Sequence, residues 1–316
     1  MKKITKQTIT EKAKAFISQH QMSNASFAKK AGIRGEYLTH IFRENSDFTV
    51  PTGSEKNTVI ADKYFQKIAD FIGLSLQKTY WEIKPTQQLT AALATLSDAK
   101  DFGTTNIIIG ETGCGKTHSL DLFLRKNPTD TFIITVGSTD NLADLIDKVI
   151  DQLKITTGKT KSKKLRDIAR KLSSLKEDGH SPQLIFDEAE YMKQPALCSI
   201  KELYDALNKH CGIVLVGTDQ LLNNIDSLRK KNKPGIPQFY RRIKFGIRRL
   251  PSVDRTYKLF LDGLSPDVVK FLRQICDNYG ELHDVLVPVR REAERTDNAI
   301  TVEFIKKVLN LSDIAA

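Results

Sequence analysis

Cysteine is scarce in this chain of 316 residues. The four cysteines stand at positions 114, 198, 211 and 276, and no two of them have the C-x-x-C spacing. This scatter excludes a disulfide framework and a structural zinc site, which need paired or regularly spaced cysteines. We therefore expect the thiols to be reduced, as they are in cytosolic proteins.

Long apolar runs are also missing. No uninterrupted stretch approaches the roughly 18 apolar residues that a membrane-spanning helix needs. The basic start Met1-Lys2-Lys3 is not followed by the apolar segment of a signal peptide. The sequence therefore predicts a cytoplasmic protein that does not associate with membranes.

Acidic residues are outnumbered. The chain has 49 Lys and Arg against 38 Asp and Glu, a formal net charge of +11. Such a balance favours a polyanionic partner, nucleic acid or an anionic membrane surface, and because no membrane association is expected, nucleic acid is the predicted partner. The length allows about two or three domains, and an apolar fraction of 40% is enough for their cores.

The most informative segment that is present reads G-x-x-x-x-G-K-T. It follows the apolar run 106–109 and precedes a helix-like segment, 118–125, which is the strand–loop–helix setting of a phosphate-binding P-loop. Glycines let backbone N–H groups face the phosphates, and the helix N-terminus adds partial positive charge. Lys116 is expected to reach the β- and γ-phosphates of ATP, and Thr117 to ligate Mg²⁺. The predicted nucleotide contacts are Gly110, Glu111, Thr112, Gly113, Cys114, Gly115, Lys116, Thr117 and His118.

A second acidic motif completes the expected site. The apolar run 183–186 ends in Asp187 and Glu188. Asp187 is expected to hold the Mg²⁺ shell, and Glu188 to orient or deprotonate the attacking water. A buried strand that ends in a polar turn would look the same by itself. Because this motif follows a P-loop, hydrolysis of a nucleoside triphosphate is the better interpretation.

Strands and helices alternate through the middle of the chain. The expected strands are 106–109, 131–136, 183–186, 212–216 and 243–247, and the expected helices between them are 118–125, 141–153, 165–176 and 195–210. This alternation predicts an α/β fold with a parallel sheet. We expect an all-α helix-turn-helix domain at 1–84, the P-loop ATPase core at 85–250 and a helical block at 251–316.

Residues 24–43 match the pattern of a helix-turn-helix. Ala28 is small enough for a helix crossing, Gly32 suits the turn, and Ile33, Leu38 and Ile41 would hold the second helix. An αα-hairpin or a protein-docking module remains an alternative. If the motif reads DNA, the candidate contacts are Arg34, Glu36, Tyr37, His40 and, at a phosphate, Arg43.

The strand 212–216 also ends in a polar turn, Gly217-Thr218-Asp219. In a P-loop ATPase this position monitors the γ-phosphate, so Thr218 is the candidate sensor, with Asp219 as the second choice. A plain Gly-Thr-Asp turn is the alternative.

Basic residues concentrate in two segments. Between 229 and 258 there are eleven basic residues and one acid, which suits an arginine finger for a neighbouring subunit or contacts with nucleic acid phosphates. Arg242 is the first choice as the finger, because it precedes the expected strand 243–247, and Arg241 is the second. The second segment is expected to be a lysine-rich loop between the helices 141–153 and 165–176. Such a loop suits binding to nucleic acid backbones, and a plain exposed loop is the alternative. The expected DNA contacts are Arg229, Lys230, Lys231, Lys159, Lys161, Lys163 and Lys164.

Taken together, these motifs resemble the Mu B-like AAA+ ATPases, which select target DNA for transposases. The resemblance covers the whole chain by architecture and rests on 24–43, 110–117, 184–188 and 214–218. It implies a C-terminal AAA+ lid and a homo-oligomer, a helical filament or a ring, on double-stranded DNA with low sequence preference. It also implies contact with a DDE transposase, hydrolysis that releases DNA, and a bacterial or phage-infected cell as the setting.

One position departs from the AAA+ pattern. The lid of this family often carries Gly-x-Leu-Arg, whose Arg touches the nucleotide, whereas this chain has Gly280-Glu281-Leu282-His283. His283 is shorter and mostly neutral at pH 7. Either this second sensor is weak, or Arg290 or Arg291 replaces it.

Two other functions share these motifs. A helicase loader or replication initiator would use the same ATP site but prefer single strands or a specific origin. An ATP-switched transcriptional regulator would use the helix-turn-helix as a sequence-specific anchor.

Overall fold

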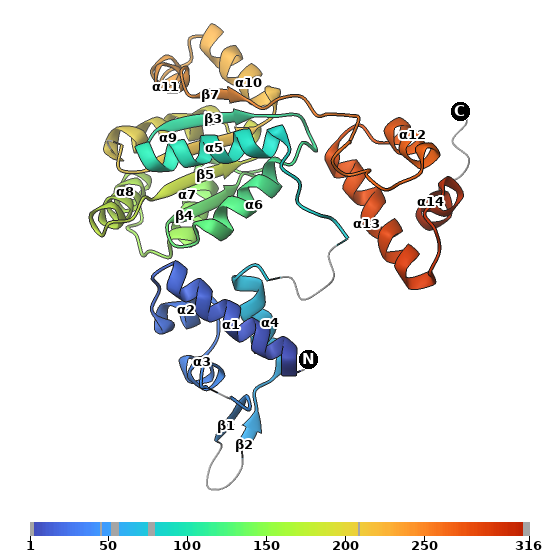
Figure 1. Ribbon diagram of the computed structural model, residues 1–316. Helices are drawn as coiled ribbons and strands as arrows, with labels where there is room; N and C mark the ends of the chain where they lie inside the picture. Colours follow the sequence, from blue (N-terminus) through green and yellow to red (C-terminus); the bar gives the residue numbers. More distant parts are fainter. Residues whose placement is uncertain (1–2, 45, 52–56, 75–79, 208, 312–316) are drawn as a thin grey trace. The chain divides into compact units, whose positions relative to one another are not determined.

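The computed structural model describes residues 3–44, 46–51, 57–74, 80–207 and 209–311 (Figure 1). Contacts divide the chain into two compact units, Met1–Thr79 and Tyr80–Ala316. Among the described residues, no helix combines the length and apolar character that crossing a membrane requires.

The first unit is mainly helical but also contains a small sheet. Its elements are α1 (Lys3–Gln19), α2 (Asn24–Lys30), α3 (Gly35–Ile41), β1 (Thr49–Pro51), β2 (Asn57–Val59) and α4 (Asp62–Phe71). Strands β1 and β2 pair antiparallel, so the expectation of an all-α domain is wrong. Within β1, Val50 is buried between the less buried Thr49 and the exposed Pro51, which is the two-residue period of a strand. Residues 45 and 52–56 of this stretch lie outside the described part.

Helices α2 and α3 occupy the segment predicted to be a helix-turn-helix. The Ser23 side chain caps α2 by accepting a hydrogen bond from the Ser26 N–H, 3.1 Å. Gly32 has a φ of +66° in the turn, a conformation that glycine adopts without strain. The residues chosen for the core of this motif, Ala28, Ile33, Leu38 and Ile41, are all buried.

The second unit is built on a five-stranded parallel sheet in the order β4-β5-β6-β3-β7. Its strands are β3 (Thr105–Ile109), β4 (Thr131–Thr135), β5 (Gln183–Asp187), β6 (Gly212–Gly217) and β7 (Ile247–Arg249). The first four match predicted strands, and the α/β fold class is confirmed. Parallel strands end at the same edge of a sheet, so β3, β5 and β6 bring the P-loop, the acidic motif and the sensor turn to one edge.

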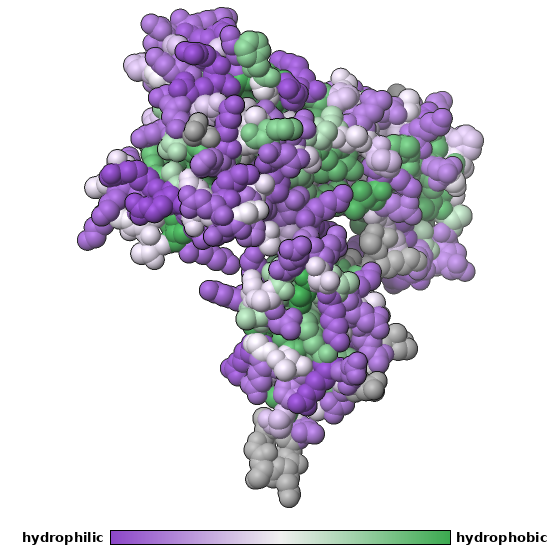
Figure 2. Space-filling model, turned by 60° about the vertical axis from the view of Figure 1, so that its left-hand side comes forward, coloured by the Kyte–Doolittle hydropathy of each residue, from purple (hydrophilic) through white to green (hydrophobic). Residues whose placement is uncertain are grey.

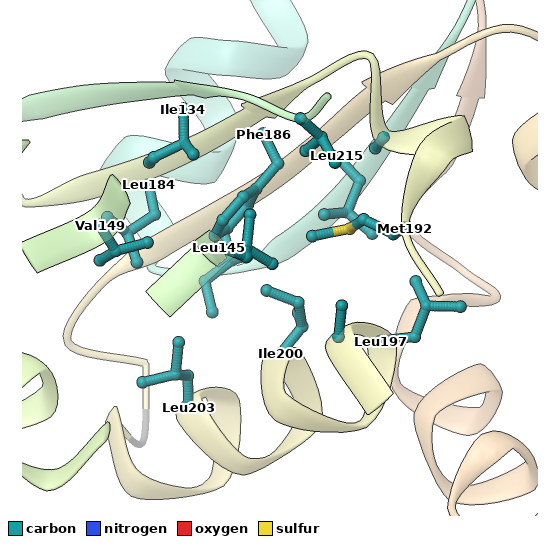
Figure 3. Close-up of a cluster of buried hydrophobic side chains, with 14 of the residues drawn as sticks. Ile134, Leu145, Val149, Leu184, Phe186, Met192, Leu197, Ile200, Leu203 and Leu215 are labelled. Carbon is teal, nitrogen blue, oxygen red and sulfur yellow. The ribbon is translucent and has the colours of Figure 1, made fainter. Parts of the chain in front are cut away.

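Helices cover both faces of this sheet (Figure 1). On one face, α5 (Gln87–Phe102) and α6 (Lys116–Lys126) pack on Ile108, Ile185 and Val214. On the other face, Leu184, Phe186 and Leu215 meet α7 (Leu142–Leu153), α8 (Lys161–Glu177) and α9 (Gln194–Leu207), as Figure 3 shows in part. The alternation of buried faces follows from the two-residue period of strands. Hydrophilic residues dominate the surface seen in Figure 2.

The segment after β6 differs from the prediction. It forms α10 (Asp219–Lys230) and α11 (Ile236–Ile243), and the following strand is β7 at 247–249 rather than 243–247. The buried residues Ile236, Phe239 and Ile243 have helical spacing, and Pro237 lies in the first turn, where proline is tolerated. The strand expected directly after Arg242 is therefore wrong.

The C-terminal helical block, called the lid below, consists of α12 (Pro266–Ile275), α13 (Tyr279–Thr296) and α14 (Val302–Leu309). These helices share a core with Tyr257 and Phe260 of the segment that leads into them. The Tyr257 hydroxyl donates a hydrogen bond of 2.6 Å to the Cys276 carbonyl, which ties this segment to the end of α12.

Candidate nucleotide site

The P-loop is already wrapped around the Lys116 ammonium. Gly113 and Gly115 have φ values of +72° and +94°, which let the loop turn tightly into α6. Lys116 Nζ donates hydrogen bonds to the carbonyls of Gly110 (2.9 Å) and Glu111 (2.8 Å). Phosphate oxygens are stronger acceptors than carbonyls because they are charged. The Lys116 ammonium therefore lies where the predicted phosphates would bind.

The Thr117 hydroxyl and the Asp187 carboxylate meet, as their predicted shared role requires. Thr117 Oγ1 donates a hydrogen bond of 2.9 Å to Asp187 Oδ2, which joins the start of α6 to the end of β5. Both groups present hard oxygen atoms, the ligands that Mg²⁺ prefers. Asp187 is buried, with only 4% of its surface exposed. The pair therefore fits a Mg²⁺ ion.

Glu188 turns away from the core immediately after Asp187. Its side chain is exposed, and its φ of +55° is rare for a residue other than glycine. The Glu188 N–H donates a hydrogen bond of 3.0 Å to Asp187 Oδ1. Strained conformations of this kind persist where the surroundings fix them and are common at functional sites. Here the conformation separates two adjacent carboxylates into one buried group and one exposed group.

The sensor candidate Thr218 lies beside the P-loop. It follows β6, whose last residue, Gly217, accepts a hydrogen bond of 3.1 Å from the Gly110 N–H. The Thr218 hydroxyl donates a hydrogen bond of 3.1 Å to Glu190 Oε1. The reserve candidate, Asp219, pairs with Arg249. Sequence reasoning missed Glu190, because nothing in its local pattern indicates a contact with a residue 28 positions away.

A cavity of about 400 Å³ adjoins the P-loop. One wall is formed by P-loop residues including Lys116 and Thr117, and the other is aromatic, with Trp81, Phe260 and Tyr279. The rings of Trp81 and Phe260 are stacked with centroids 4.5 Å apart. Cavities with an apolar wall and a few polar groups are typical of small-molecule sites. A phosphate pocket beside an aromatic wall suits a nucleotide with its base.

His283 and His118 also line this cavity, from the lid and from α6. Burial lowers the pKa of His118, which favours its neutral form. The rings of His283 and Trp81 form a T-shaped pair, with centroids 5.2 Å apart. Arg290, the alternative second sensor, instead donates hydrogen bonds to the carbonyls of Tyr80 (3.1 Å) and Phe260 (3.0 Å). The neighbouring Arg291 is exposed, and it does not line the cavity as His283 does.

The lid docks directly on the P-loop. The Gly280 N–H of α13 donates a hydrogen bond of 3.0 Å to the Gly113 carbonyl, and a Cβ at Gly113 would come within 2.1 Å of the Asn278 side chain. Cys114 is buried in the lid core, and this burial raises the pKa of its thiol. The side chain of Cys114 thus has a packing role that the P-loop motif alone did not indicate.

The arginines proposed as fingers have different surroundings. Arg242 lies in α11, where its Nε donates a hydrogen bond of 2.8 Å to Asp205 Oδ1 of α9 and its Nη1 one of 2.9 Å to the Gln238 carbonyl. Arg241, one residue earlier, is exposed. The rigid strand base expected for Arg242 does not exist, because this part of the chain is helical.

The second lysine-rich segment is not a loop. Lys161, Lys163 and Lys164 form the first turn of α8, which Thr160 caps through a hydrogen bond from the Lys163 N–H, 3.3 Å. The prediction placed the start of this helix too late, because the buried stripe of α8 begins only at Leu165. Lys159, Lys161 and Lys163 are exposed, whereas Lys164 pairs with Asp147.

The other candidate DNA contacts are mostly at the surface. Lys230 and Lys231 are exposed, and Arg229 is exposed while its guanidinium lies 4.2 Å from the centre of the Tyr240 ring. In the first unit, Tyr37 is half-buried and packs on Tyr64. Also in that unit, His40 is half-buried, and the exposed candidates are Arg34, Glu36 and Arg43.

Comparisons with known proteins agree with this geometry. A protein-family model described as an AAA domain matches residues 104–225, which run from the start of β3 into α10. Curated proteins gave no match. The solved structure of Cdc6p from Pyrobaculum aerophilum is similar with a TM-score of 0.53 and 17% identity, over 77% of this chain and 70% of that one. The ORC2 protein of Aeropyrum pernix, in ADPNP–ADP complexes, is similar with a TM-score of 0.52 and 16% identity, over 75% of this chain and 70% of that one.

The chain thus has an α/β fold with a P-loop domain, like the AAA+ ATPases. At these identities the structural likeness concerns the fold alone. Neither finding is specific to the Mu B-like proteins, so that resemblance stays a prediction.

Proposed function

We propose that this protein binds ATP with Mg²⁺, hydrolyses it, and uses the nucleotide state to control its binding to DNA. The observation that carries the proposal is the contact of Thr117 Oγ1 with Asp187 Oδ2, 2.9 Å, beside Lys116 and the exposed Glu188. Two hard oxygen ligands, the Lys116 ammonium and an exposed carboxylate then meet at the same edge of the sheet. This is the set of groups that hydrolysis of a nucleoside triphosphate needs.

Each residue has a separate task in this proposal. Lys116 exchanges its two carbonyl partners for phosphate oxygens, and Glu188 accepts a proton from the attacking water. Thr117 and Asp187 would hold Mg²⁺, which when bound would offset negative charge on the phosphates. The aromatic wall formed by Trp81 and Phe260 receives the base.

In this proposal, an arginine finger from a neighbouring subunit completes the ATP site. Because Arg242 is engaged by Asp205, we place Arg241 first as the finger. Arg241→Ala should bind ATP like the wild type but hydrolyse it poorly. Mixing it with Lys116→Ala protein should restore part of the turnover, measured as phosphate release, because Lys116→Ala subunits still supply a finger to Arg241→Ala sites. A mixture of Arg242→Ala with Lys116→Ala serves as the comparison. If turnover is restored in this mixture but not in the mixture with Arg241→Ala, Arg242 is the finger.

DNA is the partner that the basic surface fits best. The exposed Lys159, Lys161 and Lys163 surround the start of α8, where cations are disfavoured by the helix dipole. Their presence there opposes helix stability, which is understandable if they meet an anion. Arg229, Lys230 and Lys231 extend the basic character of the same unit.

Changing Lys159, Lys161 and Lys163 to Gln should weaken binding to all duplex sequences alike. Every lysine–phosphate ion pair that the change removes should reduce the log–log salt slope by about 0.9. The slope is measured by fluorescence anisotropy across a salt series. The control replaces three other exposed lysines with Gln and so removes the same charge. These are Lys126 on α6, Lys176 on α8 and Lys270 on α12. An equal weakening in both variants would show a general charge effect rather than a specific DNA-binding surface.

Among the possible roles on DNA, we favour a replication initiator or helicase loader. This choice is by analogy of fold: two solved structures of similar fold are a Cdc6 and an ORC2 protein. Selection of target DNA for a DDE transposase is the second candidate. It rests on the order of the α2–α3 segment, the P-loop core and the lid.

Electron microscopy with ATP and random duplex DNA separates these roles. Continuous filaments or rings on random duplex DNA would favour the transposition role. Binding that is confined to single strands or to one origin sequence would favour the initiator or loader. Strong preference for a single operator would instead favour a transcriptional regulator. Failure to bind ATP at all would contradict the proposal as a whole.

A further inference from the structure

Glu190 connects the two loops that carry the predicted catalytic groups. It lies in the 3₁₀ turn Ala189–Tyr191, immediately after Glu188. Its Oε1 accepts a hydrogen bond of 3.1 Å from the Thr218 hydroxyl, and its carbonyl accepts one of 3.0 Å from Asn224 Nδ2 of α10. The turn after β5 is therefore joined to the turn after β6 and to the helix that follows.

The Glu190 carboxyl occupies a space that is shaped around it. Its Oε2 is buried and has no hydrogen-bond partner among the described residues. The adjacent Gly217 is needed for this placement, because a Cβ there would come within 2.5 Å of Oε2. A buried oxygen without a partner is unfavourable and calls for an explanation. Its place beside the sensor suggests that the explanation lies in catalysis.

The direction of one hydrogen atom decides what Thr218 can bind. A threonine hydroxyl has a single hydrogen to donate and two lone pairs that accept. The hydrogen bond of 3.1 Å that Thr218 Oγ1 donates to Glu190 Oε1 uses this hydrogen, so while that bond is intact Thr218 can only accept hydrogen bonds in the site. A γ-phosphate without protons has no hydrogen to donate, whereas the attacking water has two.

We infer that Glu190 is a positioning residue, which orients Thr218 to accept a hydrogen bond from the attacking water rather than to bind the γ-phosphate. The water donates its other hydrogen to Glu188, which leaves a lone pair of its oxygen free for the phosphorus. The new bond forms between this oxygen and the γ-phosphorus. The bond from the γ-phosphorus to the β–γ bridging oxygen breaks, its electron pair stays on ADP, and Glu188 takes the water proton. This inference rests on the proposed ATPase function.

The test compares Glu190→Ala, Glu190→Gln and Thr218→Val in steady-state hydrolysis and in titrations with ATP and ADP. Glu190→Ala should lower kcat by about 10²-fold, the effect of a misplaced reactant, with unchanged affinity for both nucleotides. Glu190→Gln should recover most of the turnover, since its amide oxygen can still accept from Thr218. Thr218→Val should lose as much as Glu190→Ala, and the double variant should lose no more, because both changes remove one interaction.

Gly217→Ala provides an independent variant, because its methyl group should displace the Glu190 carboxylate and lower kcat while leaving nucleotide affinity unchanged. Thermal unfolding of each variant identifies any loss of folding, and Glu190→Gln retains the side-chain volume if Glu190→Ala fails to fold. Full kcat in a folded Glu190→Ala protein would overturn the inference alone. A fall in affinity for ATP but not for ADP in Thr218→Val would place Thr218 on the γ-phosphate and also overturn it. A wild-type protein without any ATPase activity would overturn both the inference and the proposed function.

Discussion

Lys116→Ala should reduce the affinity for ATP by at least about 10²-fold, because it removes the cation that the P-loop surrounds. Charge-assisted hydrogen bonds contribute about 1.5–3 kcal/mol each, and about 1.4 kcal/mol corresponds to a tenfold change in affinity. The two hydrogen bonds that Lys116 Nζ makes to Gly110 and Glu111 show that its ammonium is already in place. We expect ATP-dependent DNA binding to be lost as well. Titration with a fluorescent ATP analogue measures the first effect, and anisotropy of labelled duplex DNA measures the second.

Lys126→Ala is the matched control for this experiment. Lys126 is the last residue of the same helix, α6, and its side chain is exposed. The change in net charge is identical, so an effect of net charge alone on nucleotide affinity would appear in both variants. Thermal unfolding shows whether the Gly110 and Glu111 carbonyls, left without Lys116, destabilise the loop. Nucleotide affinity that stays the same in a folded Lys116→Ala protein would contradict the P-loop assignment.

The strands that carry the site could be predicted because each is a short apolar run with a clear end. β3, β5 and β6 are buried along their whole length, which is typical of parallel strands covered on both faces. Their order also follows from motifs that must share one edge of the sheet. The Thr117–Asp187 contact could therefore be expected from sequence, although 70 residues separate the two.

The errors have local physical causes. β7 is only three residues long, with two of them exposed, so it gives little apolar signal, and the helical spacing of Ile236, Phe239 and Ile243 was overlooked. The first turn of α8 contains no buried residue, so its lysines resembled a loop. Short elements with few buried residues are the ones that sequence patterns describe least well.

Contacts between distant segments that no motif specifies could not be predicted. The hydrogen bond from Gly280 to Gly113 and the contact of Thr218 with Glu190 depend on how the lid and the strand ends pack. No periodicity or motif specifies them. They determine, however, how the P-loop meets the lid and which partner the Thr218 hydroxyl has.

Glu188→Gln should separate ATP binding from hydrolysis, in contrast to Lys116→Ala. The Glu188 side chain is exposed beside the buried Asp187, so its replacement should not disturb the Thr117–Asp187 pair. An amide does not accept a proton at neutral pH, and loss of a general base typically lowers turnover by about 10²–10⁴-fold. We therefore expect ATP affinity close to that of the wild type, loss of phosphate release, and DNA complexes that persist while ATP is present.

The measurements are phosphate release, nucleotide titration and the dissociation rate from labelled duplex DNA. Glu202→Gln is the control, because Glu202 is an exposed glutamate on α9 whose change to glutamine alters the charge equally. Dissociation from DNA should slow only in Glu188→Gln, since release depends on hydrolysis in this proposal. If Glu188→Gln hydrolyses ATP at the wild-type rate, the proton must go to another group, and the φ of +55° at Glu188 would then need a different explanation. If hydrolysis stops but DNA is released at the normal rate, ATP turnover and DNA binding are not coupled in this protein.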